Sequence, residues 1–435
     1  MRFGTDGVRG RANTELTPAF ALDLGRAAAQ VLRASVAVVG GDSRLSTPML
    51  EAAFVAGVAS EGVEVHRLGV TPTPAVAFEA ARIGAMGAVI SASHNPYHDN
   101  GIKLFAPGGT KLPDHVEAEI EAALAALAGH TVEPAPIHGR GGSGDAYVEH
   151  LLAMLDGRDL VGLRIVVDAA NGAASHLAAD VFGRTGAQVV VINDRPNGTN
   201  INAGCGATEP EGLRAVVTAE RAHVGIALDG DADRLIAVDE RGDIVDGDHI
   251  LAICAADLRG RGRLHDDTVV VTVMTNLGFR LAMEAVGIHV VETAVGDRYV
   301  LEALAAGGHS LGGEQSGHVI FADHATTGDG MLTAIALLDV VQRSGRPLSR
   351  LAADAMTQLP QVLVNVRVSQ RRADIAELIA AEIAAAEAEL GTTGRVLIRP
   401  SGTEPLIRVM VEAPTSELAA ATAESLAAAI RSVCP

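Results

Sequence analysis

The stretch RIVVDAANGAASH, at residues 164–176, begins with a short β-branched run and ends in small polar residues. The same order recurs where Val36–Val39 leads into GGDSRLSTP and where Val269–Val273 leads into MTNLGF. Alanine- and leucine-rich stretches of helical character follow each of these segments. Apolar runs that alternate with helices are typical of α/β layers whose parallel sheets are buried on both faces. The sequence therefore predicts three similar α/β domains.

The C-terminal part has a different pattern. From Gln361, VLVNVRV predicts a strand, and a long helix is expected over Ala373–Leu390. Two further strands, RVLIR (395–399) and IRVMVEA (407–413), precede a last helix that begins at Ser416. This succession predicts a smaller α+β domain. Together the patterns predict four domains, at residues 1–155, 156–248, 249–362 and 363–435.

Composition excludes several classes of function. The 435 residues are 48% hydrophobic, enough to bury several cores, so a disordered protein is excluded. The formal net charge of −19 disfavours nucleic acid as a partner, because such a chain repels a phosphate backbone. Three scattered cysteines indicate a reducing compartment. The sequence shows neither a signal peptide nor an apolar run of membrane-spanning length, so we expect a soluble cytoplasmic protein without a membrane partner.

Lysine is rare in this chain. Of the 34 basic residues only Lys103 and Lys111 are lysines, and a codon bias toward arginine accounts for most of this. A buried lysine can release its proton, whereas an arginine cannot readily do so. Lys103 is therefore a candidate for proton transfer.

The segment LDGDADR, at residues 228–234, carries three carboxylates at alternate positions between two apolar runs. In an extended chain this spacing places Asp229, Asp231 and Asp233 on one face. Three like charges repel each other unless a cation joins them, and Mg²⁺ is favoured where phosphate oxygens and water complete the shell. An EF-hand is disfavoured, because Arg234 stands where its sharp turn requires glycine. A solvated acidic turn fits poorly between two apolar strands.

Two further segments carry candidate reactive or sugar-binding groups. SASHNPYHDNGIKLF (91–105) follows a strand-like AVI, with Asn95-Pro96 and Asn100-Gly101 as turn signals. Such a loop can present a nucleophilic hydroxyl, but the pattern does not separate Ser91 from Ser93. In GGEQSGH (312–318), alternate residues are expected on one face of a strand, where a carboxylate, a hydroxyl and an imidazole suit the hydroxyl and amine groups of a sugar.

RPSGTE, at residues 399–404, lies between two predicted strands, with Arg408 four residues later. Small residues that expose backbone N–H groups, together with two arginines, predict an anion site for phosphate. GDR at 296–298 is a short charged turn that a surface loop explains equally well. GGDSR at 40–44 could begin a ligand-binding loop, but a strand-to-helix turn explains it equally well. The chain has neither a G-x-G-x-x-G fingerprint nor a P-loop, so nucleotide binding has no support.

These motifs, in this order, resemble the phosphohexomutases of the α-D-phosphohexomutase superfamily, from FGTDGVRG (3–10) to RPSGTEPLIRV (399–409). Several of them, TTGDG (326–330) among them, look most like the members that isomerise glucosamine phosphates. The resemblance implies four domains around a central cleft and interconversion of glucosamine 6-phosphate and glucosamine 1-phosphate. It further implies Mg²⁺, a glucosamine or glucose 1,6-bisphosphate as primer and intermediate, and a product that feeds UDP-N-acetylglucosamine and cell-wall precursor synthesis. A homodimer is compatible with it.

The resemblance also assigns roles to residues. Ser93 carries the phosphoryl group and, with the three aspartates, holds the metal. Lys103 and Arg9 lie near the phosphoserine; we take Lys103 as the general acid/base, with His318 and His94 as alternatives. The remaining expected substrate contacts are Arg234, Asp297, Arg298, Glu314 and Ser316 at the sugar, and Arg399, Ser401, Gly402, Thr403 and Arg408 at the distal phosphate.

Three alternatives stay open. A sister enzyme that acts on glucose or mannose phosphates would use the same chemistry. A phosphatase would use Asp229 as nucleophile and Asp231 as acid, and would be indifferent to Ser93→Ala. A phosphosugar sensor would bind its ligand without turnover.

Overall fold

The computed structural model describes residues 2–4, 6–127, 133–139, 143–369, 372, 374–400 and 405–434. It divides into two compact units, each described by itself below. Unit 1 comprises Met1–Met274 and Gly287–Ala355, and unit 2 comprises Thr275–Val286 and Met356–Pro435.

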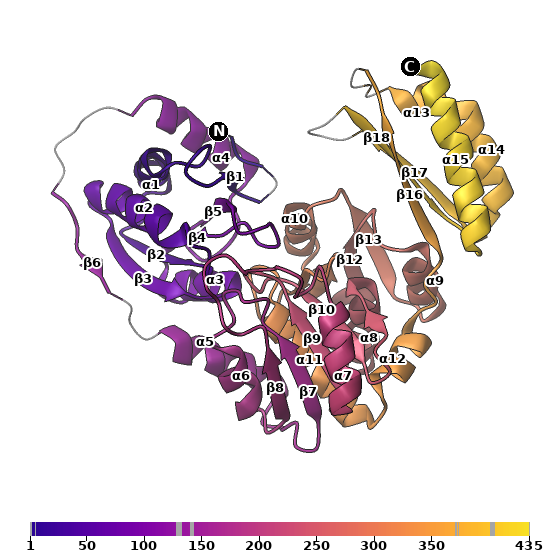
Figure 1. The fold of residues 1–435 in the computed structure, drawn as a ribbon, viewed down its shortest axis with the longest axis horizontal. Helices are drawn as coiled ribbons and strands as arrows, with labels where there is room; N and C mark the ends of the chain where they lie inside the picture. The colour runs from indigo at the N-terminus through magenta and orange to yellow at the C-terminus, as the bar shows by residue number, and fades with distance from the viewer. Residues whose placement is uncertain are drawn as a thin grey trace. The chain divides into compact units, whose positions relative to one another are not determined.

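Unit 1 contains three sheets (Figure 1). The strands of the first are β1 (Val8–Arg11), β2 (Val36–Gly41), β3 (Glu64–Val70), β4 (Met86–Ile90), β5 (Asp99–Phe105) and β6 (Ile137–His138). Those of the second are β7 (Arg164–Asp168), β8 (Gln188–Ile192), β9 (Val224–Leu228), β10 (Leu235–Asp239) and β11 (Ile244–Val245). Those of the third are β12 (Thr268–Thr272), β13 (His289–Thr293), β14 (Leu311–Gly313) and β15 (Val319–Phe321).

The three sheets share one topology. In each, the first of three parallel strands lies between the second and the third, and a fourth strand pairs antiparallel with the third. The shared orders are β5-β4-β2-β3, β10-β9-β7-β8 and β15-β14-β12-β13. The prediction of three similar α/β domains is thereby confirmed.

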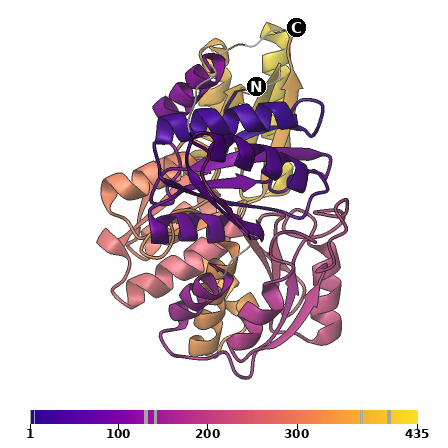
Figure 2. The same cartoon turned by 90° about the vertical axis from the view of Figure 1, so that its left-hand side faces the viewer.

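Alternation along the strands decides which helices cover which face. Ala37 and Val39 of β2 belong to the core formed with α1 (Pro18–Leu32) and α2 (Thr47–Ser60), whereas Val38 packs toward α3 (Thr73–Ile83). This is the period of two that a strand imposes on its side chains. The helices α1 and α2 lie side by side, as Figure 2 also shows, and a Cβ on Gly57 would stand 2.1 Å from the carbonyl oxygen of Leu22. Glycine therefore permits this close crossing.

The other helices of unit 1 are α4 (Asp114–Ala125), α5 (Ser143–Leu152), α6 (Ala178–Arg184), α7 (Glu211–Glu220), α8 (Gly247–Gly260), α10 (Asp297–Gly307), α11 (Gly330–Ser344) and α12 (Leu348–Ala355). Among the described residues, no helix is both long enough and apolar enough to cross a membrane.

Unit 2 is the predicted smaller α+β domain. Its elements are α9 (Leu277–Ala285), β16 (Gln361–Arg367), α13 (Ile375–Leu378), α14 (Ala380–Leu390), β17 (Arg395–Pro400), β18 (Leu406–Glu412) and α15 (Ser416–Val433). The strands form an antiparallel sheet in the order β16-β18-β17. The single helix expected over 373–390 is wrong, since the described part forms two helices that meet at Ile379.

One buried carboxylate joins α9 to this sheet. Glu412 accepts hydrogen bonds from the backbone N–H of Leu277 (2.9 Å) and from the guanidinium of Arg395 (3.0 Å). It is fully buried, and an unpaired charge there would be costly. The pairing explains why α9, which lies between two strands of the third sheet in the sequence, belongs to unit 2.

Candidate active site

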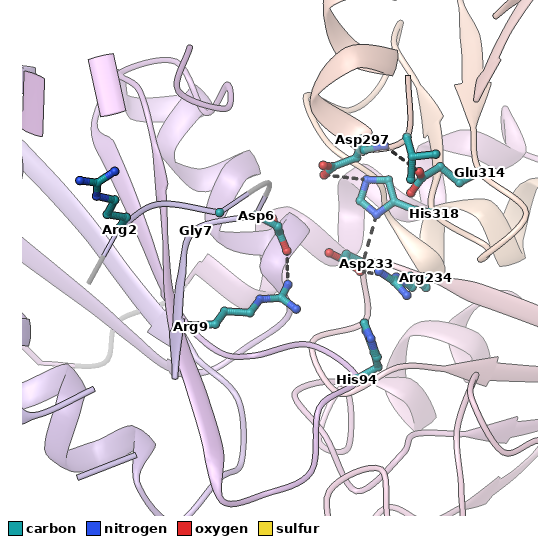
Figure 3. A pocket seen from close by; sticks show the side chains of 13 residues that line it. Arg2, Asp6, Gly7, Arg9, His94, Asp233, Arg234, Asp297, Glu314 and His318 are labelled. Atoms are coloured by element: carbon teal, nitrogen blue, oxygen red, sulfur yellow. Dashed lines mark hydrogen bonds and ion pairs between the residues drawn. The ribbon is translucent and has the colours of Figure 1, made fainter. Parts of the chain in front are cut away.

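Three predicted motifs occupy the same position in the three sheets. Ser91–His98 follows β4, Asp229–Arg234 follows β9, and Glu314–His318 follows β14. Each segment therefore joins the third parallel strand of its sheet to the antiparallel fourth. Residues of all three segments line one cavity of about 380 Å³ (Figure 3). The lining residues are Arg2, Gly4, Asp6, Gly7, Arg9, His94, Asp233, Arg234, Val295, Gly296, Asp297, Glu314 and His318.

The first segment separates the two serines that the sequence left open. The Ser93 hydroxyl donates a hydrogen bond to Asp229 (2.5 Å), across to the second sheet's loop. The Ser91 hydroxyl instead donates to Asp42 (2.6 Å) and accepts from the Ser93 N–H (2.9 Å). Ser93 also has a φ of 51°, in the left-handed region that non-glycine residues seldom adopt, and such strain clusters at functional sites. Ser93 is thus presented to the aspartates, and Ser91 supports its backbone.

A buried ion pair holds this loop from behind. Arg44 pairs with Asp42 and donates to the Ser93 carbonyl oxygen (3.1 Å), and both charged side chains are fully buried. Asn202 donates to the same oxygen (2.9 Å). GGDSR is therefore a strand-to-helix turn that positions the serine loop. This role was not predicted: the opposite charges of Asp42 and Arg44 after a buried strand mark a structured turn, but they do not show that it contacts the serine loop.

The aspartate segment is a turn, so the extended conformation predicted for it is wrong. Ala232 has a φ of 59°, and a Cβ on Gly230 would lie 2.5 Å from the carbonyl oxygen of Ser93. The turn still brings the carboxylates of Asp229, Asp231 and Asp233 together, with one oxygen of each within 4.8 Å of the others. The expected convergence is present, but it arises from a left-handed turn and a close glycine contact rather than from strand alternation.

Lys103 lies against the same cluster. Its ammonium is 2.8 Å from Asp231, 3.1 Å from Asp233 and 2.8 Å from Asp6. Burial favours loss of the proton, but the three carboxylates overcome it and raise the pKa of Lys103 well above its usual range. Lys103 therefore keeps its proton in this arrangement.

The aspartates have the chemistry of a cation site. Burial, followed by the negative charges of Asp233 and Asp231, raises the pKa of Asp229 well above its usual range. Within the described residues, one buried oxygen each of Asp231 and Asp233 has no hydrogen-bond partner. Buried carboxylate oxygens without partners are costly, and a hard cation would satisfy them. The residues present therefore fit a magnesium ion.

Lys111 joins this network, and the sequence analysis did not assign it. Its ammonium lies 2.7 Å from Asp6 and pairs with Asp297 at the start of α10. Lys103, Lys111 and Arg9 all contact Asp6, and although burial acts in the opposite direction they lower its pKa well below the usual range. Both lysines of the chain thus lie at this site. The rarity that singled out Lys103 pointed equally to Lys111.

The third segment is a turn between β14 and β15, so the strand expected to carry its polar residues on one face is wrong. Glu314 accepts from the Gly296 N–H (3.2 Å), whereas Ser316 is exposed and lies outside the cavity lining. The buried ring of His318 accepts from the Gly328 N–H at Nε2 (3.1 Å), which places its proton on Nδ1, 3.6 Å from Asp233. The dashed contacts in Figure 3 show the ring between two carboxylates.

The remaining expected residues differ in placement. His94 borders the cavity; burial, then the charges of Arg234 and Arg9, lower its pKa to about 4, so it is neutral at pH 7.

Arg298 lies outside the cavity lining, because its guanidinium pairs with Asp114 and with Glu117 (2.7 Å) of α4. The segment after β4 also differs from expectation, since Asn100-Gly101 lies within β5 and forms no turn.

Two expected phosphate-binding residues lie side by side in unit 2. Arg399 of β17 and Arg408 of β18 face each other in the antiparallel register. Burial and the positive charge of Arg408 lower the pKa of the Arg399 guanidinium. An anion between two adjacent cations would relieve this repulsion. The other three predicted residues of this motif, Ser401, Gly402 and Thr403, lie outside the described residues.

Comparison with known proteins agrees with this architecture. Models of the phosphoglucomutase/phosphomannomutase family match the chain in four parts: its α/β/α domains I, II and III at residues 1–129, 145–242 and 246–359, and its C-terminal domain at 363–429. The chain belongs to this family. It is accordingly an enzyme of the isomerase class, as the resemblance implied.

Individual relatives and solved structures show which members of this family the chain is similar to. The phosphoglucosamine mutase of Frankia alni is 56% identical over all of this chain and 98% of its own length. Among solved structures, a phosphoglucomutase/phosphomannomutase family protein from Burkholderia thailandensis is 25% identical, with a TM-score of 0.82 over 98% of this chain and 97% of its own. The N-acetylphosphoglucosamine mutase of Aspergillus fumigatus, solved with GlcNAc-6P and magnesium, is 20% identical, and the match covers all of this chain and 96% of its own, with a TM-score of 0.73.

Proposed function

We propose that the protein interconverts glucosamine 6-phosphate and glucosamine 1-phosphate through a phosphoserine at position 93. The observation that carries the proposal is the placement of Ser93: buried, strained, and donating to Asp229 within the aspartate cluster. Full-length relatives with 51–56% identity, named phosphoglucosamine mutase, support this substrate.

The reaction consists of two phosphoryl transfers. In the first, the bond between phosphorus and the Ser93 oxygen breaks while a bond to the C1 hydroxyl oxygen of glucosamine 6-phosphate forms. The C1 hydroxyl loses its proton to the general base, and the Ser93 oxygen takes up a proton to become a hydroxyl. The resulting 1,6-bisphosphate turns over in the site. In the second transfer the bond between phosphorus and the C6 oxygen breaks while a bond to the Ser93 oxygen forms. The Ser93 hydroxyl loses its proton, the C6 oxygen takes one up, and glucosamine 1-phosphate leaves. A bisphosphate of this kind would also prime the unphosphorylated enzyme.

We propose that the three aspartates and the phosphate on Ser93 hold Mg²⁺. The Mg²⁺ complex of the Aspergillus protein, which shares this fold, supports this proposal. When bound, the ion supplies positive charge that offsets the negative charge of the transferring phosphoryl group. The chain itself aligns Ser93: Arg44 and Asn202 hold its carbonyl oxygen, and Ser91 holds its N–H.

We assign proton transfer to Lys103. Its ammonium is protonated and can donate a proton to a leaving sugar oxygen, and neutralisation of the neighbouring carboxylates would bring its raised pKa closer to that of an effective acid. To act as a base it must first lose its proton, which requires that the charges of Asp231 and Asp233 be neutralised. His318 and His94 remain the alternatives; His94 is neutral at pH 7 and lies with its Nδ1 3.4 Å from the Ser93 hydroxyl.

Three of the residues expected at the sugar line the cavity, whereas the two described residues expected at the second phosphate belong to unit 2. We propose that Glu314, Asp297 and Arg234 contact the sugar, because all three line the cavity. Ser316 and Arg298 would contact it only after moving from their present positions. Arg399 and Arg408, with the serine, glycine and threonine at 401–403, would hold the phosphate that is not reacting. The cytoplasmic location and the homodimer stay predictions.

A competition experiment tests substrate and reaction together. The protein receives Mg²⁺, a trace of glucose 1,6-bisphosphate, and equal concentrations of glucosamine 6-phosphate and glucose 6-phosphate, and ³¹P NMR follows the products. We expect the glucosamine 1-phosphate signal to grow first. Faster growth of glucose 1-phosphate would assign the protein to the sister activity, and growth of free phosphate alone would indicate the phosphatase that uses Asp229.

A further inference from the structure

A second group of metal-ligating side chains lies at the edge of the first sheet, away from the cavity. Strands β3 and β6 are parallel, and His66 of β3 is in register with His138 of β6. Side chains alternate along a strand, so Glu64 shares the face of His66, and the paired His138 lies on that face too. The three residues form the histidine–glutamate cluster.

Both imidazoles of the cluster point to one oxygen. The Nε2 atom of His66 lies 2.7 Å from a carboxylate oxygen of Glu64, and the Nε2 atom of His138 lies 3.0 Å from the same oxygen. The rings are edge to face, with centroids 5.1 Å apart. The three side chains are between 38% and 53% exposed, so an ion can reach them from solvent. They thus present two nitrogens and one oxygen at the apices of a small triangle.

This triangle has nearly the size that a zinc site requires. In tetrahedral coordination with bonds of about 2.0–2.2 Å, neighbouring ligand atoms lie roughly 3.3–3.5 Å apart. The two nitrogen–oxygen distances observed are shorter by a few tenths of an ångström, so a small outward rotation of the side chains makes room for the ion. Solvent would supply the fourth ligand.

The charge state of the cluster also suits a metal. The hydrogen bond from His66 is the main cause that lowers the pKa of Glu64, so this carboxylate is ionised at neutral pH. A metal ligand must be deprotonated, and imidazoles bind in their neutral form. Two imidazole nitrogens select borderline transition metals such as Zn²⁺ over Mg²⁺, which prefers oxygen ligands.

We propose that Glu64, His66 and His138 bind one divalent transition-metal ion of the zinc type, at a site separate from the aspartate cluster. The ion would cross-link two parts of the chain that are otherwise joined weakly. Strand β6 has two residues and lies in the connection between α4 and α5. Coordination by His138 would fasten this connection to β3 and close the edge of the first sheet, in addition to the backbone bonds that β6 already makes.

Zinc binding to the full-length protein tests this proposal. Metal-stripped wild type and the variants His138→Ala, His66→Ala and His265→Ala are dialysed against Zn²⁺ in excess Mg²⁺, and bound zinc and the thermal midpoint are measured. His265 is the matched control, since it is half-exposed and lies 3.6 Å from a carboxylate, that of Asp323. Any zinc on the aspartate cluster is common to all four proteins and cancels in the comparison.

We expect wild type and His265→Ala to bind one zinc ion more than the other two variants and to gain thermal stability from it. Loss of a residue that only hydrogen-bonds to a metal ligand costs roughly 10–100-fold in metal affinity. Loss of a ligand itself should lower the zinc affinity of this site by at least as much. The midpoint without zinc and the mutase activity in Mg²⁺ report whether each variant is folded. Equal zinc content and equal thermal shifts in wild type and in the folded His138→Ala variant would overturn the proposal.

Discussion

Among the residues that the structure describes, three metal-ligating side chains come together in two places, and the two clusters differ in burial, in ligand type and in the elements that supply them. Asp229, Asp231 and Asp233 are almost completely buried, offer only oxygen and come from one turn. The histidine–glutamate cluster is half-exposed, offers two nitrogens and comes from two strands. Burial makes like charges expensive, so the first cluster is surrounded by cations, whereas water screens the second.

The difference in burial between the two clusters explains the role of the two lysines. Lys103 is buried and Lys111 is partly buried beside Asp6, and Lys103 also contacts two of the three aspartates. A buried cluster with several carboxylates needs such fixed positive charge to fold. The surface cluster contains a single carboxylate, and two imidazoles suffice for it. The buried cluster can therefore take part in reactions of a highly charged group, and the surface cluster is suited to a structural ion.

The largest expected effect comes from removing the group that faces the buried cluster. Ser93→Ala should lower mutase activity by a factor on the order of 10⁴ or more, because no other hydroxyl is presented to Asp229 among the described residues. Ser91→Ala is the matched control, and we expect a loss of roughly tenfold, since Ser91 only supports the loop. Steady-state kinetics measures both. Equal losses in the two variants would contradict the assignment of Ser93.

Removal of the positive charge of Lys103 is expected to have the next largest effect. Lys103→Met should lower kcat/KM by about 10²–10⁴ and destabilise the fold by roughly 3–5 kcal/mol, because it leaves the carboxylates uncompensated. Mg²⁺ should restore part of the lost thermal stability, since it replaces the missing charge. Lys103→Arg keeps the charge but cannot release a proton, and full activity in that variant would contradict proton transfer by Lys103.

The pKa values of Asp329 and Glu64 are shifted in opposite directions, so the pH dependence of stability can distinguish the surroundings of the two clusters. Asp329 lies near the aspartate cluster, and burial, the largest cause, raises its pKa to about 6. The hydrogen bond from His66 lowers the pKa of Glu64 in the surface cluster. An acid whose pKa is raised binds its proton more tightly in the folded state, so its contribution to stability falls as pH rises from about 4 to about 6. The lowered pKa of Glu64 has the opposite sign: its contribution is lost as pH falls below the usual range.

Asp329→Asn removes the pH-dependent contribution of Asp329 to stability. The amide keeps the acceptor that caps α11 through the N–H groups of Met331 and Leu332. We expect the variant to gain stability relative to wild type by roughly 1–3 kcal/mol between about pH 4 and about pH 7. Thermal midpoints at the two pH values measure this difference. A difference that does not change with pH would show that Asp329 is ionised throughout.

The smallest effect on catalysis is expected at the surface cluster. His138→Ala should leave kcat/KM in Mg²⁺ unchanged within about twofold, because nothing in the described cavity lining depends on β6. The activity of Lys111→Met, a variant at the buried network, should fall more. A large loss of activity in His138→Ala would show that the two clusters are coupled, and would contradict a purely structural role of the surface cluster.

Sequence patterns predicted the fold and most of the site for identifiable reasons. The apolar runs before GGDSRLSTP, DAANGAASH and MTNLGF are strands that are buried on both faces, and such strands are legible without tertiary information. The convergence of the aspartates was predicted from their alternate spacing in an extended segment, and the need of close like charges for a cation pointed to a metal. The conformation predicted for this segment was wrong, since neither the left-handed φ of Ala232 nor the close approach of Gly230 to the Ser93 carbonyl oxygen follows from the residue pattern.

What the sequence did not predict depends on contacts between distant segments. Arg44 supports Ser93 from 49 positions away, and Thr73 donates to Asp231 (2.7 Å) from another sheet's helix. Arg298 was expected at the sugar, but α4 supplies carboxylates that draw it away. No local pattern encodes such pairs. The equivalent placement of the three site loops likewise appears only once the strand order of each sheet is known.

Mapping the phosphoryl group tests the central claim most directly. The protein is incubated with Mg²⁺ and glucose 1,6-bisphosphate labelled with ³²P, digested, and analysed by mass spectrometry before and after a chase with unlabelled glucosamine 6-phosphate. The label should be found on Ser93 and should leave it during the chase to appear in sugar phosphate. Label on Ser91, or label on Ser93 that glucosamine 6-phosphate does not remove, would contradict the account.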